Sequence, residues 1–90
     1  MAIINIPTPL RKFTNQNRVF ETDRDDLPGA LDHLVQEYPA IKKNLFDENG
    51  NVRSYIKIYI GDEEVKPQKN GSVKLEKNTE ISIIPAIAGG

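Results

Sequence analysis

One stripe of apolar residues with helical spacing constrains the fold of this chain more than any other feature. Between residues 27 and 38, apolar side chains recur at positions i, i+3, i+4, i+7, i+8 and i+11, and polar residues fill most of the other positions. Asp26 is a favourable N-cap, and Pro28 falls in the first turn, where its missing N–H costs little. Pro39 restricts the residue before it and ends the pattern. The sequence therefore predicts one helix with a single apolar face.

Alternating apolar and polar residues on both sides of this helix predict a sheet. We expect strands over residues 2–6, 18–22, 55–60 and 80–84, with a short strand around residues 64–66. Because one apolar helix face can cover one face of a sheet, the predicted class is α+β. The expected architecture is a mixed four- to five-stranded sheet with one main helix packed on one face.

The connections follow from proline, glycine and polar residues. Pro7 and Pro9 end the first strand, because neither can donate to a strand ladder. We expect turns at residues 14–17, 61–62 and 77–78, a short helical turn at residues 41–45, and loops at residues 47–51 and 67–72. Ile81 and Ile83 should face the core, and Val73 and Leu75 should lie beneath the sheet.

Size, charge and residue content exclude several classes of function. A chain of 90 residues forms one small domain, which we place at residues 1–85, followed by a flexible tail at residues 86–90. Twelve basic residues oppose thirteen acidic ones, evenly in both halves of the sequence, which argues against nucleic-acid binding. The sequence has no cysteine, no transmembrane run and no secretory signal pattern, so we expect a cytoplasmic protein that does not bind a membrane.

Catalysis by the chain itself is not expected. The sequence contains no Ser-His-Asp arrangement and no phosphate-binding loop, and cysteine is absent as a nucleophile or metal ligand. The one histidine, His33, falls on the polar side of the predicted helix, where we expect it to be solvated. We therefore expect no metal site and no bound cofactor.

The pair Gly89-Gly90 closes the sequence and is the main candidate for chemistry. Fraying explains many terminal glycines. Here, however, the pair follows Pro85, which should direct the chain out of the sheet, and the small or moderate residues Ala86, Ile87 and Ala88. Without Cβ atoms, two glycines can pass through a narrow channel and bring an α-carboxylate to a reactive centre. An ionised carboxylate is a poor electrophile, so a partner must activate it with ATP before sulfur or nitrogen can take the acyl group.

The whole pattern resembles the ThiS/MoaD family of ubiquitin-like sulfur carriers. The ending ISIIPAIAGG, the segment YIKIYIGDEEV at residues 55–65 and IPTPLR at residues 6–11 carry the resemblance, together with the helix before Tyr38-Pro39. The resemblance extends over nearly the whole chain and implies a β-grasp fold. Within the family, the chain looks similar to the branch that carries sulfur for cysteine biosynthesis and to the molybdopterin synthase small-subunit branch.

The resemblance implies a carrier cycle in which the chain is a co-substrate and not an enzyme. A ubiquitin-activating-like adenylyltransferase would consume ATP to adenylate Gly90, and a sulfur donor would convert the adenylate to a thiocarboxylate. Gly89, Ala88 and Ile87 would give the tail access to the partner. The sulfur would pass to an acceptor, either a cysteine-synthase-like enzyme, which we favour, or a molybdopterin synthase large subunit. Isopeptide conjugation to other proteins, and a passive interaction domain, are the alternatives.

A second candidate site is the face of the sheet away from the helix. We expect Ile3, Tyr55, Tyr59 and Ile84 there, where they either form a docking patch for a partner or are scattered apolar residues without a role.

Overall fold

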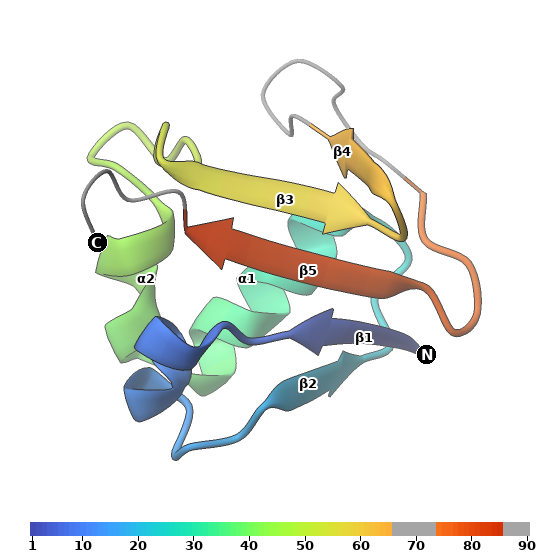
Figure 1. The fold of residues 1–90 in the computed structure, drawn as a ribbon, viewed down its shortest axis with the longest axis horizontal. Helices are drawn as coiled ribbons and strands as arrows, with labels where there is room; N and C mark the ends of the chain where they lie inside the picture. The colour runs from blue at the N-terminus through green and yellow to red at the C-terminus, as the bar shows by residue number, and fades with distance from the viewer. Residues whose placement is uncertain (66–73, 86–90) are drawn as a thin grey trace.

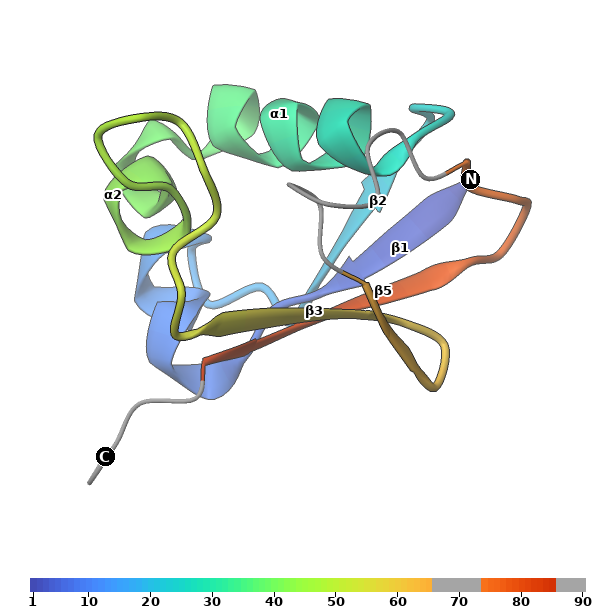
Figure 2. The same ribbon diagram turned by 90° about the horizontal axis from the view of Figure 1, so that it is seen from above.

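The computed structural model describes residues 1–65 and 74–85, in which one helix lies across a five-stranded sheet (Figures 1 and 2). The two predicted layers are therefore confirmed. In chain order, the elements are β1 (Ala2–Asn5), the 3-10 helix η1 (Thr8–Phe13), β2 (Val19–Thr22), α1 (Leu27–Glu37), the 3-10 helix η2 (Pro39–Ile41), α2 (Lys42–Leu45), β3 (Ile56–Ile60), β4 (Glu63–Val65) and β5 (Glu80–Pro85).

The strand order β2-β1-β5-β3-β4 gives the sheet two distinct ends. β1 and β5 run parallel, whereas the other three pairs are antiparallel. The carboxyl ends of β1 and β5 therefore lie beside the amino ends of β2 and β3. We call this the exit end, because β5 finishes there at Pro85, and we call the other the far end (Figure 1).

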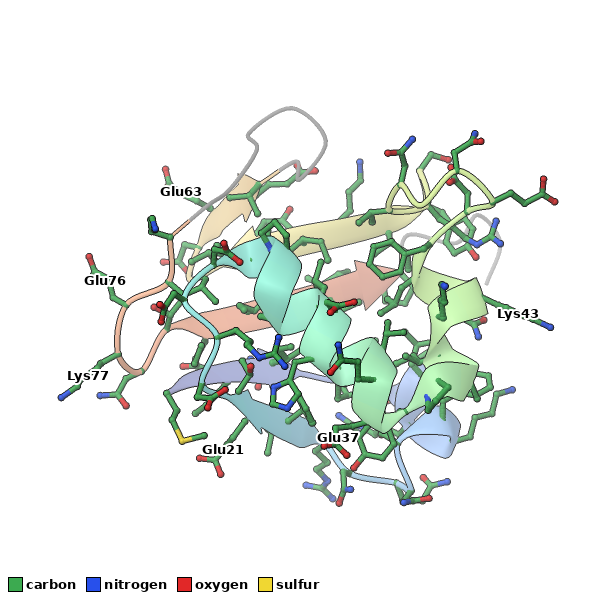
Figure 3. All side chains as sticks on the ribbon, turned by 180° about the vertical axis from the view of Figure 1, so that it is seen from behind. Glu21, Glu37, Lys43, Glu63, Glu76 and Lys77 are labelled. Atoms are coloured by element: carbon green, nitrogen blue, oxygen red, sulfur yellow. The ribbon has the colours of Figure 1, made fainter. Side chains whose placement is uncertain are left out.

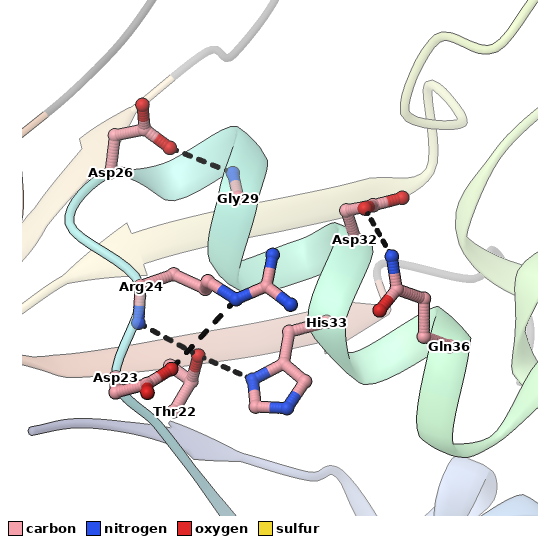
Figure 4. Close-up of polar contacts among 8 residues, drawn as sticks. All are labelled: Thr22, Asp23, Arg24, Asp26, Gly29, Asp32, His33 and Gln36. Atoms are coloured by element: carbon pink, nitrogen blue, oxygen red, sulfur yellow. Dashed lines mark hydrogen bonds and ion pairs between the residues drawn. The ribbon is translucent and has the colours of Figure 1, made fainter.

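The predicted helix boundaries are confirmed, and the contacts explain them. The Asp26 carboxylate accepts a hydrogen bond of 2.8 Å from the Gly29 N–H, which satisfies one of the free donors of the first turn (Figure 4). Pro28 lies in that first turn, and α1 ends at Glu37, two residues before Pro39. The short helical turn predicted for residues 41–45 is also present, as α2.

The core lies between α1 and the sheet. Its side chains come from the strands, from α1 and from the shorter helical segments. Ile81 and Ile83 are among them, which confirms their predicted inward orientation. Leu75 packs against this core, whereas residues 67–72 and Val73 lie outside the described residues. The buried apolar residues are Ala2, Ile4, Ile6, Leu10, Leu27, Ala30, Leu31, Leu34, Ile41, Leu45, Val52, Ile56, Ile58, Ile81 and Ile83.

His33 corrects the expectation of a solvated side chain. The imidazole is half-buried, and its Nδ1 lies 2.8 Å from Oγ1 of the fully buried Thr22 (Figure 4). The rings of His33 and Phe20 also contact each other in an edge-on arrangement, at a centroid distance of 5.0 Å. The prediction is wrong because α1 lies close to β2 along this side, so that strand side chains cover part of the polar helix face.

No helix within residues 1–65 and 74–85 is long and apolar enough to cross a membrane.

Candidate functional site

The exit of β5 is a rigid point at the centre of the sheet. β5 pairs with β1 on one side and with β3 on the other, and its final residue, Pro85, is in register with Ile56. Ile81 and Ile83 anchor the same strand in the core. The first part of β5 is therefore held by two strand ladders, and its last residue, Pro85, is held by the ladder with β3.

The 3-10 helix η1 lies at the exit end and was missed by the sequence analysis. The Arg11 side chain donates from Nε to the Ile6 carbonyl at 3.0 Å, which ties η1 to the strand before it. Buried Thr14 ends the segment, with its hydroxyl 2.9 Å from the Asn17 carbonyl. Pro7 and Pro9, which the sequence identifies as strand breakers, also form the start of this helix, with Pro7 at the N-cap and Pro9 in the first turn. The spacing of Leu10 and Phe13 was the available signal for a helical turn.

A groove of about 490 Å³ opens beside the last residue of β5. Its walls come from η1, from α2, from the start of β3 and from the end of β5, and they are mostly apolar. The ammonium of Lys12 stands at this groove, 5.3 Å from the centroid of the Phe13 ring. The lining residues are Pro9, Leu10, Lys12, Phe13, Asn44, Tyr55, Ile56 and Pro85.

The predicted docking patch divides into two parts. Tyr59 pairs with Ser82, so Ile84, two residues further along β5, lies diagonally across from it toward the exit end. Tyr55 lies just before β3 and lines the groove, with 38% of its surface exposed, and Ile84 is 46% exposed.

Ile3 stands apart from these three residues. It pairs with Glu80 at the other end of β5. The Asn5 amide donates to the carboxylate of Glu80 at 3.2 Å and to the Ser82 hydroxyl at 3.3 Å, so polar side chains separate Ile3 from the rest of the patch. The tail residues singled out from the sequence, Ile87, Ala88, Gly89 and Gly90, lie outside the described residues.

A metal site at the exit end would need a group of acidic or histidine side chains. Within residues 1–65 and 74–85, these side chains form no group of three or more that could hold a metal ion. The exit end combines the last residue of β5 with a neighbouring groove whose walls are mostly apolar.

Comparison with known proteins places this geometry in a family. The model of the ThiS family matches residues 4–90. The sulfur carrier protein CysO of Mycobacterium tuberculosis (strain ATCC 25618 / H37Rv) is 28% identical over 89 residues, which cover 97% of this chain and 96% of the relative.

Solved structures agree with this sequence match. CysO in the Amycolatopsis orientalis BexX/CysO complex superposes with a TM-score of 0.84 at 25% identity, over all of both chains. M. tuberculosis CysO gives a TM-score of 0.83 at 25% identity, covering 97% of this chain and 100% of the other. SAMP1 from Haloferax volcanii, at 20% identity and a TM-score of 0.79 over 99% and 98% of the two chains, shares the fold.

The fold is therefore a ubiquitin-like β-grasp, as the resemblance implied. Because the family model extends over nearly the whole sequence, the chain belongs to the ThiS family.

Proposed function

We propose that this chain is a sulfur carrier whose Gly90 carboxylate is adenylated, converted to a thiocarboxylate and used as a sulfur donor. The observation that carries the proposal is the match to the ThiS family through residue 90, joined to the end-to-end similarity to CysO sulfur carriers. The fixed end of β5 at Pro85 supports it, because a carrier must present its reactive group from a defined point.

Covalent geometry limits how far that group can reach. Five residues follow Pro85, and at roughly 3.4 Å per residue they span at most about 17 Å. The body is 24 Å across its shortest axis. A partner that acts on Gly90 must therefore have its active site within about 17 Å of Pro85, which brings its surface close to the exit end.

The proposed chemistry requires the partner to supply every catalytic group. A carboxylate oxygen of Gly90 attacks the α-phosphorus of ATP, the bond from that phosphorus to pyrophosphate breaks, and an acyl adenylate forms. Hydrosulfide then attacks the acyl carbon and displaces AMP, which leaves the thiocarboxylate. The absence of a Cβ at Gly89 and Gly90 permits close approach of the partner's backbone on both sides.

We propose cysteine biosynthesis as the pathway that receives the sulfur, in line with the CysO relatives. The A. orientalis CysO was crystallised in a complex with BexX, which supports a carrier that docks on a partner protein. A molybdopterin synthase would instead form a stable complex between this chain and a large catalytic subunit, and copurification distinguishes the two. A protein modifier would give conjugates of higher mass that depend on Gly90.

Intact-mass spectrometry tests the proposal. The chain is incubated with ATP, sulfide and the activating adenylyltransferase of its source organism, and the expected product has one oxygen replaced by sulfur. A matched chain without Gly90 should stay unmodified. If the complete chain never gains this mass difference while the same enzyme preparation modifies a second carrier protein used as a positive control, the proposed function is wrong.

A further inference from the structure

The fold separates charges that are balanced along the sequence. Segments that begin or end at the exit end, namely η1, the start of β2, α2 and the approach to β3, carry mostly basic side chains. Among the described residues, the basic side chains at this end are Arg11, Lys12, Arg18, Lys42, Lys43 and Arg53, against Glu37 at the end of α1 and Asp47 and Glu48 in the loop after α2.

The far end has the opposite character. It holds the end of β2, the connection to α1, the β3–β4 turn and the turn before β5, where Asn78 N–H donates to the Met1 carbonyl at 3.0 Å. Figure 3 shows Glu21, Glu63 and Glu76, with Lys77 beside Glu76, on one side of the molecule and Lys43 on the opposite side. Among the described residues, the acidic side chains here are Glu21, Asp23, Asp25, Asp26, Asp62, Glu63, Glu76 and Glu80, against Arg24, Lys74, Lys77 and the amino group of Met1.

The distance between the two ends makes this separation effective. The longest axis of the molecule is 33 Å, whereas charges are screened over about 8 Å at physiological ionic strength. A partner close to one end therefore experiences mainly the charge of that end. Over residues 1–65 and 74–85, the charges are therefore separated between the two ends, although the formal net charge of the whole chain is only −1.

One basic side chain, that of Lys12, lines the groove beside Pro85, and Arg53 and Lys43 lie in segments next to it. Lys12 lies over the Phe13 ring, and the Arg53 side chain donates from Nε to the Lys43 carbonyl at 2.6 Å. The second contact joins the approach to β3 with α2, whose Asn44 lines the groove. Mostly apolar walls, the ammonium of Lys12 and the neighbouring Lys43 and Arg53, which we call the basic rim, therefore occur together at the end of β5.

We propose that the exit end docks on an acidic surface that surrounds the tail channel of the activating enzyme, with an apolar side chain of the enzyme seated in the groove. This inference rests on the proposed function and names the chemistry of the partner surface. The short reach of the tail forces the exit end against the enzyme, and only carboxylates there complement the basic rim. The acidic far end faces away and disfavours approach in the reverse orientation.

Charge reversal at the two ends gives a matched test. The variant Lys12→Glu with Lys43→Glu changes the exit end, and Lys74→Glu with Lys77→Glu makes the same change in net charge at the far end. All four side chains are exposed. We expect the exit-end variant to raise the KM for the carrier in adenylation by about tenfold at low ionic strength, with kcat unchanged, and the difference to shrink with added salt. The far-end variant should keep the original KM.

Replacement of Tyr55 by Ser tests the groove separately. Its effect on KM should persist at high salt, because apolar contact is not screened. Thermal unfolding establishes that each variant is folded. Equal KM changes in the two lysine variants, or a larger change at the far end, would overturn the docking proposal, and so would a Tyr55→Ser KM equal to that of the parent chain. Failure of the parent chain to be adenylated at all would instead overturn the proposed function.

Discussion

Asp26 and Gly29 contact each other at the start of α1, so substitutions at the two positions should change the free energy of unfolding non-additively. The Asp26 carboxylate accepts from the Gly29 N–H at 2.8 Å. Replacement of an N-cap aspartate by alanine costs about 1 kcal/mol of stability. Asp26→Ala should therefore lower the free energy of unfolding by about 1 kcal/mol. Asp32→Ala, on the exposed side of the same helix, should change it by less than about 0.5 kcal/mol.

Gly29→Ala has two opposing effects in the parent chain. Alanine is the better helix former, by up to about 1 kcal/mol. A Cβ at position 29, however, would stand 2.8 Å from the capping oxygen of Asp26 and 3.4 Å from the Arg24 Cβ. The Asp26 side chain must then rotate away and give up the cap, at a cost of about 1 kcal/mol. The two effects should cancel to within about 0.5 kcal/mol.

The cancellation disappears when Asp26 is already alanine. In that background Gly29→Ala should stabilise the protein by about 0.5–1 kcal/mol, because no capping oxygen remains to be displaced. Urea unfolding of the parent chain, the two single variants and the double variant measures the coupling directly. Strict additivity of the two single changes, with a coupling below about 0.3 kcal/mol, would refute the steric and capping argument.

Two further stability predictions follow from the buried contacts. Thr22→Val removes the hydroxyl that accepts from the Arg24 N–H and contacts His33, so it should lower the free energy of unfolding by about 1–2 kcal/mol. Thr22→Ser keeps this hydroxyl and should retain most of the stability. A loss of similar size in both variants would assign the effect to packing. Ile81→Ala leaves a cavity at a fully buried position and should lower the free energy of unfolding, measured in urea, by about 3 kcal/mol. Ile84→Ala, on the exposed face, should lower it by less than about 1 kcal/mol. Similar losses at both sites would contradict the assigned strand orientation.

The sequence was sufficient for the helix and most of the sheet because local signals coincide with the tertiary structure. Asp26, Pro28 and Pro39 mark helix boundaries through backbone geometry alone, and the alternation of Ile56 and Ile58 with polar residues identifies a buried strand face. The inward orientation of Ile81 follows from the same alternation.

His33 and η1 show where local signals are insufficient. Helical spacing assigns His33 to the polar side of α1, but it does not reveal that β2 lies against that side and supplies Thr22 and Phe20 as neighbours. Pro9 ends a strand and begins a 3-10 helix equally well, and the choice depends on contacts with distant residues.

For the candidate site, local sequence points to the glycine pair but not to the surface beside Pro85. Gly89-Gly90 could be named from the end of the sequence, whereas the groove beside Pro85 draws its walls from four segments far apart in the chain. The charge separation was hidden for the same reason. Each half of the sequence is nearly neutral, because the chain passes between the exit end and the far end several times.

The central claim is that the chain carries sulfur on the carboxylate of Gly90, and the most direct measurement is the intact mass after incubation with ATP, sulfide and the activating adenylyltransferase. We expect a product in which one oxygen is replaced by sulfur, and fragmentation should assign the change to Gly90. The chain that lacks this residue should give no such product. An unchanged mass beside a working positive-control carrier, or sulfur assigned to any other residue, would contradict this claim.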